Sequence, residues 1–215
     1  MGELAFRLDL DKEEILLAKL IGLLHDIGRF PQWQKYKTFS DSESVDHADM
    51  GVEYLFKDGH IREYIEDSKY DNIIEKAIKY HNKFSEDLKK EEFSEKEMLF
   101  VKMIRDMDKV DIYKQAAVTY NLVFDANELS EEVLAEFKKE KEIRYSLVKK
   151  RKNSDKVVIW LAFIFDINFN ESFDILVETD NFDLFLSTID VKEDSENLFR
   201  KLKEICFDKI NRGVE

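Results

Sequence analysis

Apolar residues recur at spacings of three and four positions along almost the whole chain. This spacing places them on one face of an α-helix, and it predicts an all-α fold. Proline and glycine, which punctuate strands and turns, number only one and six residues. Asp11 and Glu14 form a D-x-x-E helix start before residues 15–24, the most apolar segment. Because this segment is apolar nearly all round, we expect its helix to lie at the centre of a bundle.

Gly28 and Pro31 are expected to end this helix, because the residue before a proline is disfavoured in helical dihedrals. The polar and aromatic residues 30–43 predict an ordered loop. We expect further helices over residues 44–56, 70–82, 94–113 and 195–211. Residues 130–152 are charge-rich and predict a long exposed helix that ends in the basic run 149–152. Residues 157–169 are strongly apolar, and we expect them to be buried against the first bundle. The chain has no internal repeat and no low-complexity linker, which favours one cooperative unit.

The composition narrows the class of protein. With 47 acidic and 34 basic residues the formal charge is −13, which disfavours nucleic-acid binding, since a surface that tracks phosphates is normally basic. A hydrophobic share of 44% is enough for a packed core and excludes wholesale disorder. The single Cys206 excludes an internal disulfide and a multi-cysteine zinc site, and favours a cytoplasmic protein. No signal-peptide pattern opens the chain, and residues 15–24 are too few to span a bilayer, so no membrane partner is expected.

The pair His25-Asp26, at the end of the most apolar helix, is the first candidate for chemistry. An aspartate is rarely fully buried unless it is paired or bound to a metal. An imidazole beside a carboxylate offers one nitrogen and one oxygen ligand, a set that suits Zn, Mn, Fe or Mg. A His-Asp dipeptide also occurs often by chance, so a capped helix end is the alternative interpretation.

Three further features strengthen the metal interpretation. His81 lies on the apolar face of its helix, where a hydrogen-bonded core histidine is the alternative. His47, in the segment DHADMG, starts a helix and shares a face with Gly51, although taken alone it would be assigned as a surface or capping residue. The apolar helix around Met107 carries several carboxylates in the segment RDMDKVD. A carboxylate on an apolar face needs a partner, and a metal ion is one natural partner.

The order of these motifs resembles the HD-domain superfamily of metal-dependent phosphohydrolases, in which a His-Asp pair is followed by His-x-x-x-Gly, a helical histidine and an aspartate-lysine pattern such as MDKVD. The stretches LLHDIGRF and TFSDSESVDHADMGVEYLF are especially similar to one bacterial branch of uncharacterised HD hydrolases, and WLAFIFDINF is similar as well. The resemblance covers residues 17–113 well and the remainder loosely. It implies an HD-domain-like helical bundle over residues 1–125, with a C-terminal helical extension over residues 126–215 that packs on it.

The resemblance also implies the metal ligands. His25 and Asp26 match the signature pair, and His47 and His81 match histidines that hold a second ion in two-metal members or face the substrate phosphate in one-metal members. Asp108 matches the closing ligand. Asp106 competes with it, because both flank the apolar stripe centred on Met107 and periodicity cannot separate them.

The remaining candidates are weaker. Arg29 lies where relatives often carry a basic residue, and its guanidinium could grip a phosphate, with a solvated charge near a helix end as the alternative. Lys109 is a second phosphate candidate. His60 matches nothing in the family and is assigned to a loop. Trp33 and Tyr36 could wall the pocket, with structural packing as the alternative.

One ligand of the family pattern is missing from this chain. The family's first metal histidine lies on a helix upstream of the His-Asp pair, whereas no histidine precedes His25 here. Residues 1–8 resemble the end of that helix, with Ala5, Phe6 and Leu8 as its apolar remainder. Either the natural protein begins earlier or the lineage has lost the ligand, and in both cases we expect weaker metal binding or none.

The leading hypothesis is a metal-dependent phosphohydrolase that acts on a phosphate ester, either a nucleotide or a phosphorylated small molecule. A divalent cation would activate water and polarise the phosphoryl oxygen. The protein groups expected to assist are Asp26, Asp46 or Asp49 for orienting the water, Arg29 and Lys109 for the equatorial oxygens, and His47 or His81 for the leaving group.

Two alternatives belong to other classes. The first is a catalytically impaired HD-fold module that senses nucleotides or binds proteins. The second is a structural helical protein whose acidic face contacts a basic partner, a reading that the charge permits without supporting it. The sequence leaves the oligomeric state open.

Overall fold

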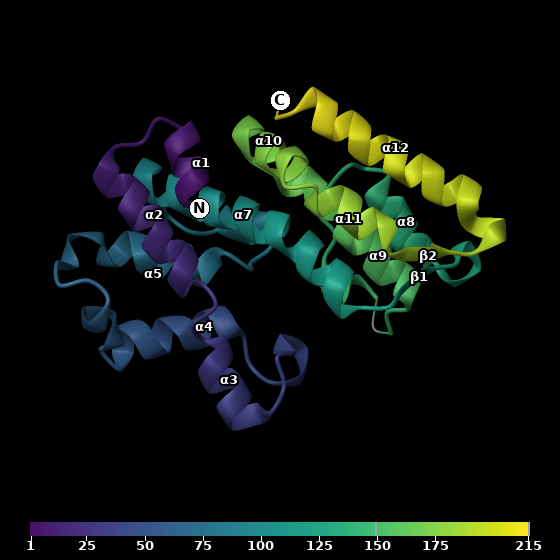
Figure 1. The fold of residues 1–215 in the computed structure, drawn as a ribbon. Helices are drawn as coiled ribbons and strands as arrows, with labels where there is room; N and C mark the ends of the chain where they lie inside the picture. Colours follow the sequence, from purple (N-terminus) through teal and green to yellow (C-terminus); the bar gives the residue numbers. More distant parts are fainter. Residues whose placement is uncertain (149, 215) are drawn as a thin grey trace. The chain divides into compact units, whose positions relative to one another are not determined.

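The computed structural model describes residues 1–148 and 150–214, and most of them are helical, which confirms the all-α fold class (Figure 1). The chain forms two compact units, Met1–Arg105 and Asp106–Glu215. The boundary between them falls inside one helix, α7 (Glu95–Thr119). The division expected at residue 125 stays a prediction. No helix of the described part of the chain is both long and apolar enough to cross a membrane.

The first unit is built from short helices that precede α7. They are α1 (Gly2–Arg7), α2 (Lys12–Leu24), α3 (Arg29–Tyr36), α4 (His47–Val52), α5 (Asp71–Tyr80) and α6 (Ser85–Leu88), with a π-helical turn Glu53–Lys57 and 3-10 turns at Asp41–Glu43, His60–Glu63 and Ser68–Tyr70. Neighbouring contacts run from α1 to α2, from α2 to α5, from α5 to α4 and from α4 to α3. The helices expected over 44–56, 70–82 and 94–113 are therefore present, with α4 shorter and α7 longer than expected.

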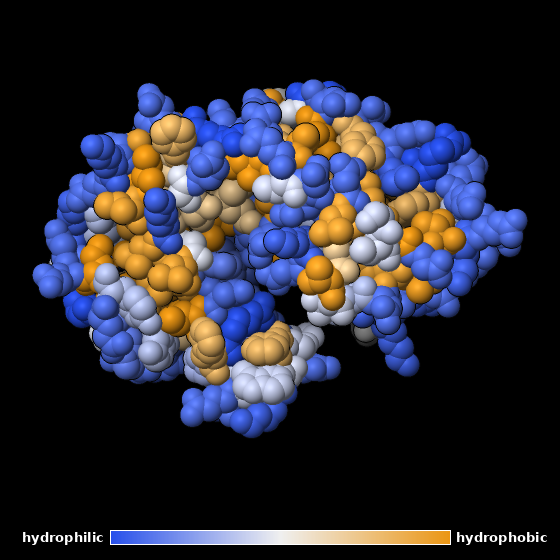
Figure 2. Space-filling model, viewed as in Figure 1, coloured by the Kyte–Doolittle hydropathy of each residue, from blue (hydrophilic) through white to orange (hydrophobic). Residues whose placement is uncertain are grey.

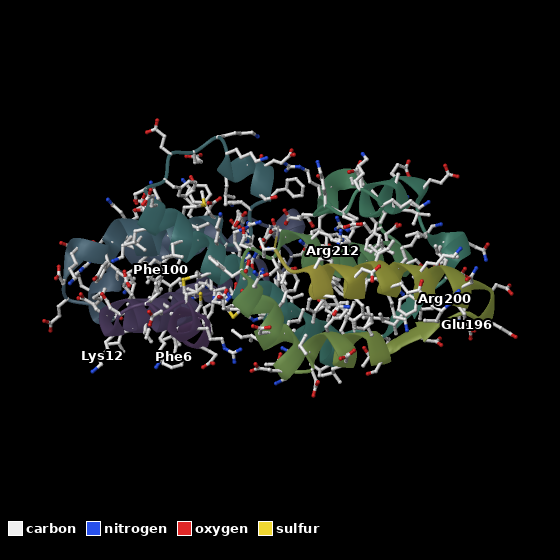
Figure 3. The ribbon with its side chains drawn as sticks, turned by 90° about the horizontal axis from the view of Figure 1, so that it is seen from above. Phe6, Lys12, Phe100, Glu196, Arg200 and Arg212 are labelled. Atoms are coloured by element: carbon white, nitrogen blue, oxygen red, sulfur yellow. The ribbon has the colours of Figure 1, made fainter. Side chains whose placement is uncertain are left out.

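The helix start at Asp11 is confirmed. The Asp11 carboxylate accepts a hydrogen bond from the backbone N–H of Glu14 at 2.8 Å, and the Glu14 side chain accepts one from the backbone N–H of Asp11 at 3.1 Å. One face of α2 is buried, whereas Leu16 and Leu23 on its other face are 64% and 73% exposed. The expectation of a helix surrounded on all sides therefore holds for one face only. Figure 2 shows the resulting apolar surface over α1 and α2, and Figure 3 labels Phe6, an exposed member of it.

The ordered loop expected over residues 30–43 is wrong for its first half, which forms α3. Pro31 stands in the first turn of this helix, where backbone N–H groups have no partner within the helix and a missing donor costs little. The helix ends where Lys37 adopts the left-handed conformation, with φ of 57°. Proline thus helps to start a second helix here, after a turn that ends α2.

In its described residues, the second unit contains the end of α7 and five more helices, with two short strands that the sequence pattern did not predict. The elements are β1 (Leu122–Phe124), α8 (Glu131–Phe137), α9 (Asn153–Leu161), α10 (Asn170–Glu178), α11 (Asn181–Ser187), β2 (Ile189–Val191) and α12 (Glu196–Arg212), with 3-10 turns at Ala126–Glu128, Tyr145–Leu147, Ala162–Asp166 and Glu193–Ser195. The strands pair in parallel, Leu122 opposite Ile189. Figure 3 labels Glu196 and Arg200 near the start of α12 and Arg212 at its end.

The long exposed helix expected over 130–152 is wrong. Helix α8 ends at Phe137, and Glu140 then turns the chain with a φ of 52°. Phe137 is fully buried, so the segment folds onto the core of its unit instead of continuing into solvent. Of the basic run 149–152, Lys149 lies outside the described residues.

The apolar segment 157–169 forms α9 and the following 3-10 turn, and its residues Val157, Ile159 and Leu161 are fully buried. Helix α9 contacts α8, α12 and β1, all in the second unit. Burial of this segment is confirmed, and its expected packing against the first bundle stays a prediction. Cys206 of α12 is fully buried in the same unit, with its Sγ 3.8 Å from the carbonyl oxygen of Leu161.

Candidate metal centre

Three helix ends of the first unit meet at the His-Asp pair. His25 caps the carboxyl end of α2, and Asp26 follows it. His47 is the first residue of α4, which Asp46 caps by accepting a hydrogen bond from the backbone N–H of Ala48 at 2.9 Å. His81 caps the carboxyl end of α5. Because each side chain projects from the end of a rigid helix, the packing of α2, α4 and α5 fixes their positions.

A close backbone crossing brings α4 to this place. A Cβ atom added to Gly28 would lie 2.0 Å from the carbonyl oxygen of His47 and 2.5 Å from the backbone nitrogen of Gly51, so no side chain fits there. His47 and Gly51 are one helical turn apart and share a face. The close crossing therefore requires glycine at position 28, whereas a Cβ added to Gly51 would meet only ordinary contacts of 3.4 to 3.5 Å. From this crossing His47 reaches Asp26.

The side chains converge on the Asp26 carboxylate. His47 Nε2 lies 3.0 Å from Asp26 Oδ1 and 3.0 Å from His81 Nε2. His81 Nε2 lies 3.8 Å from Asp26 Oδ1, and His25 Nε2 lies 3.8 Å from Asp26 Oδ2. Donor atoms of His25, Asp26 and His81 all lie within 4.8 Å of one another. His47 and His81 are buried, whereas 44% of the Asp26 side chain is exposed, so the cluster is open to solvent at one side.

Acceptors around the cluster fix which ring nitrogen carries the proton. Nδ1 of His25 donates to the carbonyl oxygen of Gly22 at 2.9 Å, and Nδ1 of His81 donates to that of Ile78 at 2.7 Å. Nδ1 of His47 donates to Asp41 Oδ2 at 2.7 Å. In the neutral form all three rings then turn an Nε2 lone pair toward Asp26. Such an outer partner on Nδ1 is typical of histidines that bind metal through Nε2.

The charges of the site favour a positive occupant. Burial would lower the pKa of His47, but its hydrogen bonds to Asp26 and Asp41 outweigh that effect and raise the pKa. Burial would raise the pKa of Asp26, but the hydrogen bond from His47 and the charges of His25, His47 and Arg29 hold it well below its usual range. His47 Nε2 faces two other acceptors, so a proton or a cation must lie among them to hold the group together.

Sequence reasoning missed the residues that support His47. Asp41 binds the outer nitrogen of His47, and the fully buried Gln32 donates through Nε2 to Asp41 Oδ1 at 2.8 Å and to the carbonyl oxygen of Val45 at 2.9 Å. Arg29 donates through Nη1 to Asp41 Oδ1 at 3.1 Å, and its Nε lies 3.5 Å from Asp26 Oδ1. The loop that carries Asp41 packs back on α3, and no local pattern in the sequence predicts that packing.

Two other carboxylates near the site already have partners. Asp46 accepts a hydrogen bond from Asn82 Nδ2 at 2.9 Å and pairs with Lys83, and Asp49 lies 3.4 Å from Lys83 Nζ. Donor atoms of Asp41, Asp46 and His47 form a second group within 4.8 Å. The hydrogen bonds from Gln32, Asn82 and Lys83 already occupy the oxygens of Asp41 and Asp46, so the group at Asp26 is the more open candidate for a cation.

Arg105 holds the end of α5 in place. Arg105 is 2% exposed, and its guanidinium donates through Nη1 to the carbonyl oxygens of Tyr80 at 3.2 Å, His81 at 3.5 Å and Lys83. A buried cation at the carboxyl end of a helix is stabilised by the carbonyl groups that the helix leaves unpaired. Arg105 therefore fixes the backbone that carries His81.

The other predicted site residues lie elsewhere. His60 stacks on Tyr54 and pairs with Glu63 at 2.6 Å, away from the cluster. Asp106, Asp108 and Lys109 belong to the second unit. Lys109 pairs with Asp166 at 2.7 Å with both side chains almost buried, so this ion pair is its observed contact, and its phosphate role stays a prediction.

Asp106 has a structural role in the second unit. It accepts hydrogen bonds from the backbone N–H groups of Asn168 at 2.9 Å and Phe169 at 3.1 Å, and from Asn168 Nδ2 at 2.7 Å. These bonds anchor the start of α10. They favour Asp108 over Asp106 as the closing ligand, and that assignment stays a prediction.

An open cluster of three imidazoles around a carboxylate, each imidazole held by an outer acceptor, could hold a divalent cation through nitrogen and oxygen. The model of the HD-domain family matches residues 1–117, which include all four residues of the cluster. The chain therefore belongs to the HD-domain family, a superfamily of metal-dependent hydrolases. No curated protein and no solved structure matches the chain.

Proposed function

We propose that this chain is a metal-dependent phosphohydrolase that acts on a small phosphorylated substrate by cleaving a phosphate ester. One observation carries the proposal: three histidines with their Nδ1 atoms engaged turn Nε2 toward one partly exposed carboxylate. A site built only for stability would bury the carboxylate among backbone donors, as the second unit does with Asp106.

The residues present fit a divalent cation. His25, Asp26, His47 and His81 supply nitrogen and oxygen ligands that suit Mn, Zn or Fe, while Mg would need more oxygen donors. Asp108 is proposed as a further ligand. A cation bound here would supply Lewis-acid polarisation of a phosphoryl oxygen and a bound water of lowered pKa.

The chain's own residues would do the remaining work. Asp41 orients His47 and holds its proton on Nδ1, so Nε2 stays directed at the reacting region. Arg29 places a guanidinium beside Asp26, where the phosphate of a substrate bound at the exposed edge would meet positive charge. In a one-metal site held by His25, Asp26 and His81, His47 is not a ligand and is the proposed proton donor to the leaving alkoxide oxygen, whereas in a two-metal site it binds the second ion instead.

The test combines metal binding with hydrolysis. We would titrate the metal-free protein with Mn, Zn, Fe and Mg by calorimetry, and then assay a panel of phosphate esters. We expect His25→Ala, Asp26→Asn and His81→Ala to weaken metal binding about 10-fold or more and to abolish turnover. His60→Ala is the matched control, since His60 lies outside the cluster.

Turnover that persists in both Asp26→Asn and His25→Ala would sink the assignment. A ligand that raises the melting temperature equally with and without chelator, in a chain without turnover, would instead favour a sensing module that has lost catalysis.

A further inference from the structure

Residues 138–156 of the second unit, here called the basic segment, differ in charge from the rest of the chain. They carry nine basic and three acidic residues, a formal charge of +6, whereas the remainder of the chain carries −19. Two of the three acids have other partners. Asp155 is fully buried against backbone N–H groups, and Glu140 pairs with Arg212 of α12. The exposed lysines described in this segment include Lys138, Lys139, Lys141, Lys150 and Lys152.

The middle of the basic segment presents apolar side chains on an anchored turn. Tyr145 and Leu147, in the 3-10 turn Tyr145–Leu147, are 41% and 40% exposed. Trp160 donates through Nε1 to the Tyr145 hydroxyl. Arg151 donates through Nη1 to the carbonyl oxygen of Tyr145, and its guanidinium carbon lies 5.2 Å from the centroid of that ring. Because these contacts already hold the turn, a partner that binds it has little ordering cost to overcome.

Helices α10 and α11 carry a surface of the opposite sign, here called the acidic surface. Residues 170–187 include five acidic residues and no basic one. The two helices contact each other, and their apolar faces are buried in the second unit. On the outside, Val177 and Leu184 are 55% and 40% exposed, and Asp174 and Asp183 are exposed as well. Asp174 and Val177 are one turn apart and share a face of α10. The acidic surface therefore sets apolar side chains among carboxylates, as the basic segment sets them among lysines.

This combination suits a protein surface better than a long polyanion. A nucleic acid bound along the basic segment would continue over a chain whose remaining charge is −19, and repulsion between exposed charges reaches about 8 Å at physiological salt. A protein surface can end where the complementarity ends. Exposed apolar side chains ringed by charges are also the arrangement of protein interfaces, which have an apolar centre and a polar rim.

We propose that the basic segment of one copy of this chain docks on the acidic surface of a second copy. Opposite charges attract the two copies and set their register, while Tyr145 and Leu147 pack against Val177 and Leu184. Because the two surfaces differ, the contact is heterologous, and each copy can bind one neighbour through each surface. The inference concerns the second unit alone and does not rest on the proposed function.

The first test measures self-association of the full chain by sedimentation velocity over a range of protein concentrations. We expect the average mass to rise with concentration at about 0.1 M salt. Raising the salt to about 1 M shortens the screening length from about 10 Å to about 3 Å, so association should weaken about 10-fold or more. A chain that stays monomeric at every concentration in low salt would overturn the inference.

Charge reversal identifies the two surfaces. One variant carries Lys141→Glu with Lys150→Glu, and the other carries Asp174→Lys with Asp183→Lys. Each variant alone brings like charges together, so its self-association should weaken about 10-fold or more. An equimolar mixture of the two should associate again, because the unchanged basic segment of one variant meets the unchanged acidic surface of the other. All four substitutions in one chain should restore self-association as well, which a purely structural role of these side chains would not produce.

The matched control carries Lys12→Glu with Lys89→Glu, the same change of charge at two exposed lysines of the first unit, and should associate as the wild type does. If the basic-segment reversal does not fold, the milder pair Lys141→Gln with Lys150→Gln should still weaken association. Association that survives either reversal, or that mixing fails to restore between two folded variants, overturns the inference. His25→Ala should leave self-association unchanged, so a failure of the metal centre and a failure of this interface are separate results.

Discussion

Asp26 and Asp106, one in each unit, show how the same side chain serves a reactive site or a scaffold. Asp26 faces imidazole nitrogens and a guanidinium, and 44% of its side chain is exposed. Asp106 is fully buried and faces the backbone N–H groups of Asn168 and Phe169. Imidazoles can exchange a proton for a metal ion, whereas backbone amides cannot. The surroundings of a carboxylate, more than its burial, therefore separate the two roles.

The same difference recurs through both units. In the second unit, Asp155 is also fully buried, and it accepts hydrogen bonds from the backbone N–H groups of Ser130 at 2.8 Å and Lys152 at 3.1 Å. Its buried acids thus anchor loops and helix starts. All four histidines of the sequence lie in the first unit, where three of them meet one acid. The polar groups described here therefore differ in role between the units: those of the second unit hold backbone segments in place, and those of the first unit gather three histidines around one acid.

The largest effect is expected from disturbing the close backbone crossing at Gly28, which brings α4 to the His-Asp pair. Gly28→Ala places a Cβ against the backbone of α4, which cannot retreat as a side chain can. We expect the first unit to lose about 4 kcal/mol or more of unfolding free energy, or to fail to fold. Thermal unfolding followed by circular dichroism measures this loss.

Gly22→Ala is the control, because an added Cβ there meets only the side chain of Met1, at 3.0 Å, and a helical alanine has better propensity. Its effect should stay within about 1 kcal/mol. A Gly28→Ala protein as stable as Gly22→Ala would contradict the close approach of the two segments.

Removing each of the two carboxylates in turn should separate the effect on stability from the effect on metal binding. Asp106→Ala leaves several buried N–H groups without an acceptor, and we expect it to cost about 3 kcal/mol while metal affinity stays unchanged. Asp26→Asn should abolish metal binding and cost less stability than Asp106→Ala, because 44% of the Asp26 side chain is exposed to water. Urea unfolding and calorimetric metal titration of both variants measure the four quantities. Loss of metal binding in Asp106→Ala would make Asp106, not Asp108, the closing ligand.

The two aspartates should also change stability with pH in opposite directions. Burial raises the pKa of Asp106 to about 6 from an ordinary value of 3.8, although the hydrogen bonds from Asn168 oppose it. The folded state then holds this proton more tightly than the unfolded chain, so the contribution is full below about pH 4 and declines as pH rises to about 6. Relative to Asp106→Asn, the wild type should lose up to about 3 kcal/mol over this window.

Urea unfolding at intervals between pH 4.5 and 7.5 gives both curves. Asp26 acts in the opposite sense, because its lowered pKa gives stability that is lost only as pH falls below 3.8. A difference between wild type and Asp106→Asn that does not change between pH 4.5 and 6.5 would show that Asp106 stays ionised when buried.

The local signals of the sequence were enough where short-range chemistry decides the structure. The capping box of Asp11 and Glu14, the apolar face of α5 and the bounds of α12 follow from spacing and residue type. The predictions for two segments were wrong for an identifiable reason. A proline after an apolar segment predicts a helix end, but Pro31 suits a first helical turn, and Glu140 turns the chain without the glycine or proline that usually marks such a turn.

The sequence predicted the residues that form the cluster, but not the residues that hold them in position. His25, Asp26, His47 and His81 were found from their order in the chain, and the structure brings them together. Asp41 and Gln32 were missed, because their roles arise when the loop after α3 folds back onto that helix, and such packing leaves no periodic pattern. Arg105 acts on carbonyl oxygens more than twenty residues away, which spacing also cannot reveal.

Cys206 can report how often the second unit opens to solvent. Its thiol is fully buried, and burial raises its pKa far above the ordinary value, so a thiol reagent in water reacts with it only when that unit opens. The sequence holds no other cysteine, so every labelled molecule records one such opening. The rate of labelling would therefore measure opening of the second unit, which carries no histidine. Opening of the first unit, which carries the cluster, would not contribute to the labelling.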